Sequence, residues 1–174
     1  MAHGWWMAVA LLGCGTSYAA GDFTDRGRRV ELRHRSFECV DVRLQPYVDR
    51  TVGSRFLAID YEIGNRCLSP ARVDFRAVTV FGQFDREMAE LPLHDWRGEI
   101  VEATLDGRAY AREALAYQPP GATVDPLERV CIDLNGLADG DPVEPVCFAE
   151  ENASLKVEQP QWEGMPWGHR REGR

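Results

Sequence analysis

The sequence predicts a mainly β protein, an antiparallel sandwich of two sheets with a short crossover helix. Apolar and polar residues alternate with a period of two over several short segments, which is typical of half-buried strands. Clusters of Gly, Pro, Asn and Asp separate these segments, as in all-β domains. Residues 100–112 are an exception, because they are rich in helix formers. These residues therefore predict the crossover helix.

The chain begins with an uncharged segment. The first 21 residues hold none of the 28 acidic and 20 basic residues, and the run from Trp5 to Leu12 is apolar. This pattern is typical of an export signal of residues 1–19, cut after Ala19. The run is too short for a membrane anchor, which needs about 20 apolar residues.

A second way of processing the signal is left open. Leu11-Leu12-Gly13-Cys14 resembles the lipobox of bacterial lipoproteins. The resemblance implies a signal of residues 1–13 and a lipid on Cys14, the first residue of the mature protein. With either cut, we expect a flexible tether over residues 20–28 and a β-sandwich domain over residues 29–158.

Cysteines remaining after the signal indicate two disulfides, since their number is even and the chain is exported. They are Cys39, Cys67, Cys131 and Cys147. Opposed residues of an antiparallel hairpin have a constant index sum. If Cys131 pairs with Cys147, the middle of the hairpin falls on Asp139, and if Cys39 pairs with Cys67, it falls on Gly53. Both positions lie within turn-forming sequence. We favour these local bridges over the alternative of Cys67 with Cys131 and Cys39 with Cys147.

The first strand expected in the domain is a basic edge strand. Between residues 30 and 35, apolar residues and His34 alternate with charged residues that include Arg33 and Arg35. One charged face is common on an edge strand, where it discourages aggregation. Alternatively, Arg28, Arg33 and Arg35 bind a partner or an anionic lipid or polysaccharide.

Further strands follow from the same alternation. They are expected at residues 40–44, 57–63, 71–82, 113–117 and 130–134, with one or two more between 143 and 157. In the segment 71–82, Val73 and Phe75 share one face while Val78 and Val80 share the other. This switch predicts a bulge near Arg76 or Ala77.

The middle of the chain gives two interpretations. The first is one or two helical turns in residues 100–112, despite Gly107, which costs about 1 kcal/mol relative to Ala inside a helix. The second is a continuous helix over residues 101–117. It would place the domain in the α+β class.

The segment from Phe56 to Phe81 consists of two alternating strands around Asn65-Arg66-Cys67 and a short turn. It resembles the strand pair of immunoglobulin-like modules in bacterial envelope proteins. The resemblance implies an immunoglobulin-like antiparallel β-sandwich. The sequence departs from that pattern in having no Trp on the expected strand.

The sequence carries no familiar catalytic or metal-binding pattern. None of its histidines has a second His or a Cys at a metal-binding helical spacing, and no Gly-x-Ser-x-Gly is present. His94 and Asp95 are adjacent, so on a strand they point to opposite faces. A secreted hydrolase with a site near these two residues, or a carbohydrate- or lipid-binding module, is the alternative to a non-enzymatic protein. We expect no metal and no cofactor.

Residues 159–174 form an irregular tail rich in Trp, Pro and Gly. Trp162 and Trp167 are costly to leave in water, so they either fold back onto the sandwich or dock on a partner. With Arg28, Arg33 and Arg35, these tryptophans are the candidate partner-binding residues.

The formal net charge of -8 argues against nucleic acid as a partner. Together, the signal and the paired cysteines predict a non-enzymatic binding or structural module of the bacterial cell envelope. We expect it in the periplasm or anchored through Cys14. Its expected partner is another envelope protein, with membrane contact only through the lipid.

Overall fold

The computed structural model describes residues 24–25, 28–29, 33–49, 56–94, 101–118, 127–151 and 154–158. The expected signal with Cys14, and the tail with Trp162 and Trp167, lie outside these residues. The expected tether is described only at Thr24–Asp25 (β1) and Arg28–Arg29 (β2), which pair with each other.

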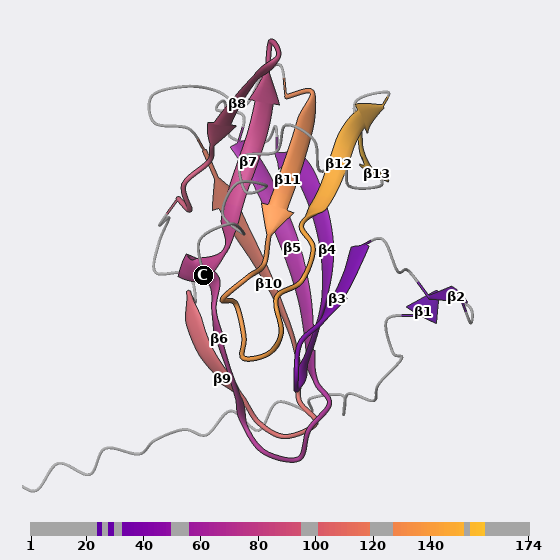
Figure 1. The fold of residues 1–174 in the computed structure, drawn as a ribbon, viewed down its shortest axis with the longest axis vertical. Helices are drawn as coiled ribbons and strands as arrows, with labels where there is room; N and C mark the ends of the chain where they lie inside the picture. Colours follow the sequence, from indigo (N-terminus) through magenta and orange to yellow (C-terminus); the bar gives the residue numbers. More distant parts are fainter. Residues whose placement is uncertain are drawn as a thin grey trace, which may run out of the picture.

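Two antiparallel sheets form the two layers of the molecule (Figure 1). The first has the order β10-β5-β4-β3 and the second the order β13-β12-β11-β7-β8. The strands of the first sheet are β3 (His34–Ser36), β4 (Val40–Asp49), β5 (Phe56–Asn65) and β10 (Tyr110–Tyr117). Those of the second are β7 (Thr79–Phe84), β8 (Glu87–Glu90), β11 (Arg129–Asp133), β12 (Val146–Glu151) and β13 (Ser154–Glu158). The prediction of a mainly β protein is confirmed.

The core lies between the sheets, where alternate residues of each strand point inward. Both layers contribute to one cluster of buried apolar side chains. It includes Val42, Leu44, Ile59, Tyr61 and Leu115 from the first sheet and Val80, Val130, Ile132, Val146 and Phe148 from the second. Burying each such side chain stabilises the fold by about 1.5–3 kcal/mol relative to leaving it exposed.

The predicted crossover helix is wrong, and so is the longer helix over residues 101–117. The structure has β9 (Glu102–Leu105), a turn, and then β10. β9 pairs with β6 (Ala71–Asp74) and buries Leu105. Its side chains therefore alternate between two faces, as in a strand. Gly107 lies in the turn against the backbone of Leu68, which leaves no room for a side chain. Tertiary packing has therefore overridden helix propensity.

The bulge expected near Arg76 is instead a 3-10 turn, η2 (Phe75–Ala77). Asp74 caps this turn by accepting a hydrogen bond from the backbone amide of Arg76. Before the turn, β6 pairs with β9, whereas after it β7 pairs with β11 and β8. The apolar residues change face because the chain leaves the β6–β9 pair at this turn and joins the five-stranded sheet as β7.

Both favoured disulfides are present, Cys39 with Cys67 and Cys131 with Cys147. The later hairpin has the predicted register, since Cys131 opposes Cys147. The earlier hairpin differs by one residue, because Val40 opposes Asn65. Its bridge therefore closes just beyond the last pair of the ladder.

Candidate functional site

The buried amide of Asn65 joins two connections at one end of the sandwich. Its nitrogen donates to the carbonyl oxygens of Ser69 at 2.9 Å and of Leu105 and Asp106 at 3.1 Å. Its oxygen accepts from the backbone amide of Cys67 at 2.9 Å. The loop after β5 is therefore bound to the turn between β9 and β10.

Arg66 binds the same loop to the turn that precedes β4. Its guanidinium donates to Asp41 Oδ1 at 2.5 Å, to the carbonyl oxygen of Glu38 at 2.8 Å and to that of Phe37. The backbone amide of Arg66 donates to the Cys39 carbonyl oxygen at 2.8 Å. Asp41 is buried, and Arg66 places an opposite charge beside it.

Two further contacts complete this end of the molecule. The backbone amide of Arg108 donates to the Cys67 carbonyl oxygen at 3.0 Å, and that of Glu38 donates to the Asp139 carbonyl oxygen at 3.2 Å. A Cβ on Gly140 would lie 2.7 Å from the Glu38 nitrogen, so these two backbone segments are in direct contact. We call residues 37–39, 66–70, 106–109 and 137–140 together the loop end. The connections from β5 to β6 and from β9 to β10 lie at the bottom of Figure 1.

The loop end presents an exposed leucine. Leu68 has 81% of its surface exposed, and the other large exposed apolar residue in the described ranges is Tyr47 at 39%. The neighbours of Leu68 are fixed by the disulfide, by Asn65 and by Arg66, so its backbone is already ordered. An apolar side chain on an ordered loop binds with little further loss of entropy.

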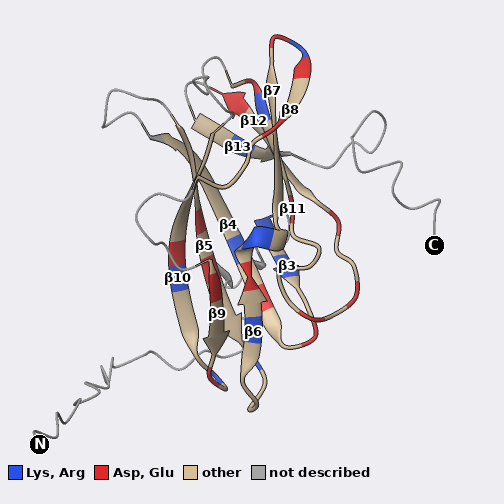
Figure 2. Cartoon of the chain, turned by 90° about the vertical axis from the view of Figure 1, so that its left-hand side faces the viewer, with Lys and Arg blue, Asp and Glu red and all other residues tan. Residues whose placement is uncertain are grey.

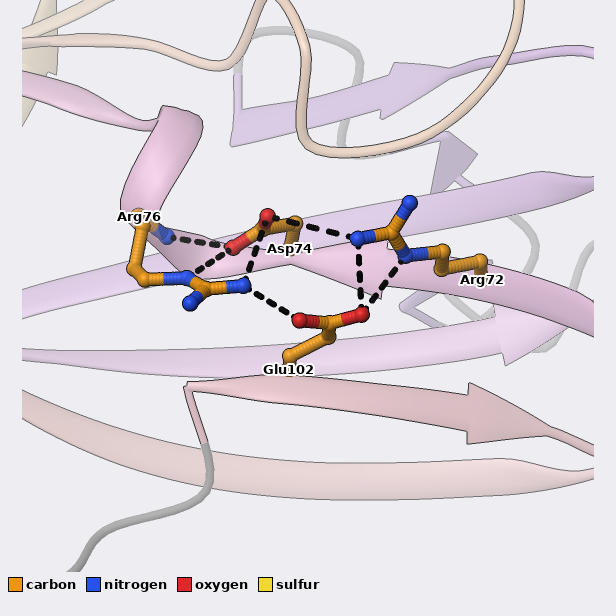
Figure 3. Close-up of polar contacts among 4 residues, drawn as sticks. All are labelled: Arg72, Asp74, Arg76 and Glu102. Carbon is orange, nitrogen blue, oxygen red and sulfur yellow. Dashed lines mark hydrogen bonds and ion pairs between the residues drawn. The ribbon is translucent and has the colours of Figure 1, made fainter.

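Four charged residues of β6, η2 and β9 lie together (Figure 3), at the end of the β6–β9 ladder where Asp74 opposes Glu102. Arg72 Nη2 lies 2.7 Å from Glu102 Oε1, Arg76 Nε lies 2.9 Å from Asp74 Oδ1, and Arg76 also pairs with Glu102. The hydrogen bond from Arg76 lowers the pKa of the Asp74 carboxyl, and Asp74 in turn raises the pKa of Arg76. Exposed pairs of this kind contribute little stability. Charges of both signs are also interspersed elsewhere on the face shown in Figure 2.

Arg35, a candidate partner-binding residue, connects the two layers. β3 lies at the edge of its sheet, as predicted. Arg35 Nε donates to the Glu144 carbonyl oxygen at 2.6 Å, and Nη2 donates to that of Pro145 at 3.1 Å. Burial lowers the pKa of Arg35, and the charge of Glu144 partly opposes this shift. These contacts give Arg35 a structural role between β3 and the segment before β12.

Arg33 has a different partner from Arg35. Arg33 donates to the Gln45 side chain on β4. Arg28 lies on β2, and its side chain is outside the described residues. The partner-binding role of these arginines stays a prediction.

His94, the candidate residue for a hydrolase, has an exposed side chain, and its backbone amide donates to the Ala116 carbonyl oxygen at 2.8 Å. Asp95 lies outside the described residues. In the described ranges, no group of three or more His, Cys, Asp and Glu side chains is placed to hold a metal ion.

A cluster that the sequence analysis missed contains Ser36, His34 and Asp41. Ser36 Oγ donates directly to Asp41 Oδ1 at 2.6 Å, and His34 Nε2 lies 3.7 Å from the same oxygen. In a hydrolytic triad the histidine stands between serine and carboxylate. Here the serine binds the carboxylate, which also pairs with Arg66, so this geometry does not activate the hydroxyl. The cluster could have been predicted from the pairing of β3 with β4, which places Ser36 opposite Asp41.

Comparisons with known proteins assign no family. No protein-family model and no curated protein matches the chain. A crystal structure of a Bacillus subtilis protein, classed provisionally as a lipoprotein, is similar with a TM-score of 0.42 and 12% identity. The match covers 68% of this chain and 38% of that one, so the chain spans well under half of that protein. In the parts of the chain that the structure describes, no helix has the length and hydropathy needed to cross a bilayer.

Proposed function

We propose that the protein is an exported, non-enzymatic binding or structural module of the bacterial cell envelope, either periplasmic or anchored through a lipid on Cys14. The observation that carries this proposal is the pair of disulfides, which uses every cysteine beyond the uncharged N-terminal segment. Disulfides persist in oxidising compartments and are rare in the cytosol. The uncharged start supplies the route to such a compartment.

The proposal includes an immunoglobulin-like topology for the sandwich. In that family, strands A, B and E are neighbours in one sheet, and C′, C, F and G are neighbours in the other. The orders β4-β5-β10 and β8-β7-β11-β12 correspond to these two sets. Two features depart from the family, since both disulfides are local and β9 pairs with β6 rather than with β10.

We place the binding surface at the loop end. Loops at the ends of a rigid sandwich commonly carry recognition. Leu68 would enter an apolar pocket of another envelope protein, and Arg72, near the start of β6, would lie at the polar rim. The support is the exposure of Leu68 on a backbone fixed from several sides.

Intact mass spectrometry of the natively processed protein tests the export. We expect a chain that begins at Ala20 or at an acylated Cys14, and a mass reduced by four hydrogens. A Cys14→Ala variant is the control for acylation. A chain that keeps Met1 and carries four free thiols would contradict the proposal.

Site-specific photo-crosslinking in the envelope tests the binding surface. A crosslinker at position 68 should capture a discrete partner. A crosslinker at position 108 should capture the same partner, and adding Leu68→Asp to that second protein should abolish the capture. Position 47, the other exposed apolar site, is the matched control. Equal capture from positions 47 and 68 would contradict a role for the loop end.

A further inference from the structure

A small apolar patch lies on the outer face of the five-stranded sheet. Val130 and Ile132 point into the core, so Cys131 between them points outward. Cys131 lies opposite Phe81 on β7 and Cys147 on β12. These three residues, the outer patch, form an apolar cluster separate from the core.

The outer patch is shielded from solvent although it faces away from the core. Cys131 is 0% exposed and Cys147 is 1% exposed. In a molecule of two layers, outward side chains normally contact water. Among the described residues, Phe81 is the apolar side chain that packs against the two cysteines. Such shielding indicates a cover, and Phe81 is the apolar part of it that lies among the described residues.

We propose that the C-terminal segment 159–174 docks on the outer patch and that Trp162 covers the Cys131–Cys147 bridge. Glu158, the last residue of β13, lies directly opposite Cys147. The segment therefore starts beside the patch. Adjacent strands lie about 4.8 Å apart, so the bridge is about 10 Å or less from Glu158. Four extended residues span about 13 Å, so Trp162 is within reach of the bridge.

The chemistry of the segment fits this surface. Residues 159–161 are Gln, Pro and Gln, so Trp162 is the first large apolar side chain after β13. Indole is flat and apolar, and aromatic rings make favourable contacts with sulfur. The next row of the same face holds Arg129 and Lys156 on either side of Ala149. These cations complement Glu163. Trp162 is then a structural residue, which leaves Trp167 as the candidate for partner contact.

The rate at which dithiothreitol reduces each bridge tests the proposal. Alkylation and peptide mass spectrometry follow the two disulfides separately in one sample. We expect deletion of residues 160–174, and Trp162→Ala in the full chain, to accelerate reduction of Cys131–Cys147 at least tenfold. Reduction of Cys39–Cys67 in the same molecules should be unchanged. Trp167→Ala is the matched control and should leave both rates near those of the unmodified protein.

Three results would overturn the proposal. One is an unchanged reduction rate of Cys131–Cys147 after the deletion. The second is equal acceleration of both bridges, which reports general loosening of the fold. The third concerns Trp96, the other tryptophan between the N-terminal segment and the tail. Acceleration by Trp96→Ala but not by Trp162→Ala would show that another segment covers the patch.

Discussion

Asn65 shows how one side chain can order a whole end of the molecule. Its amide serves three carbonyl oxygens and one backbone amide in two connections. Replacing it with Ala leaves several of these groups buried without a partner, at about 1–3 kcal/mol each. We expect Asn65→Ala to lower the free energy of unfolding by about 3 kcal/mol. Urea unfolding with both disulfides intact measures this loss.

Asn135 is the natural control for that experiment. Its amide makes similar bonds, to Asp133 and to the backbone of Val143, but it is only half-buried. Because water can replace part of those bonds, Asn135→Ala should cost less than Asn65→Ala. Equal losses at the two positions would contradict a special role for Asn65.

Tyr61 and Tyr117 form a polar contact inside the core. Their hydroxyl oxygens lie 2.7 Å apart, and both side chains are fully buried. Burial, together with Tyr117, raises the pKa of Tyr61 well above its usual value, so Tyr61 stays neutral. Each single change to Phe removes one partner and leaves the other hydroxyl with one bond fewer. A double-mutant cycle measured by urea unfolding should give a coupling of about 1 kcal/mol. Strictly additive losses would show that the two hydroxyls do not stabilise each other.

At the level of elements, the sequence predicted strands well where one face is buried. The alternation in residues 40–44, 57–63 and 130–134 leads directly to β4, β5 and β11. The later disulfide was predictable because its hairpin is local and its turn has clear sequence signals. Here, local pattern and tertiary structure agree.

Prediction from the sequence failed where contacts between distant residues determine the local structure. Residues 102–105 have good helix propensity, but pairing with β6 makes them a strand. The loop end could not be predicted, since Asn65 and Gly107 act through residues about 40 positions away or through backbone contact. Asn65 alternates like any strand residue, and the sequence around it does not indicate that its amide is buried.

The edge strand β10 carries a carboxylate on its inner side. Glu113 lies opposite Tyr61, on the face that Leu115 and Tyr117 bury in the core. Burial raises the pKa of Glu113. The folded state therefore binds this proton more tightly than the unfolded state, and this group adds stability as the pH falls through its raised pKa. An inward charge on an edge strand also discourages pairing with other chains.

We expect Glu113→Gln to stabilise the protein modestly at pH 7, because it removes the cost of burying the charge. The gain should shrink as the pH falls towards 4, where the wild-type carboxyl becomes protonated. Melting temperatures across this pH range check both the sign and the trend. Glu87→Gln, at an exposed position on β8, is the control. A gain that is independent of pH would argue against the half-buried Glu113 carboxylate as its cause.

For the whole molecule, the two disulfides hold different regions. Cys39–Cys67 lies at the loop end, whereas Cys131–Cys147 lies on the outer face of the second sheet. Between them, a single core joins both sheets. The binding surface that we propose therefore depends on one bridge directly and on the other only through overall stability. Loss of the second bridge should leave recognition intact as long as the fold survives.

Removing both bridges should leave the fold marginal or lost. The bridges span sequence separations of 28 and 16 residues, and closing such loops stabilises a protein by about 3.5 and about 3 kcal/mol. Their sum is comparable with the whole stability of a typical domain, about 5–15 kcal/mol. We expect each paired Cys→Ala variant to fold with a lowered urea midpoint, and the variant with all four changes to be largely unfolded at 37 °C by circular dichroism. A fourfold variant with the wild-type midpoint would show that the protein does not need an oxidising compartment, and the case for export would then rest on the N-terminal sequence alone.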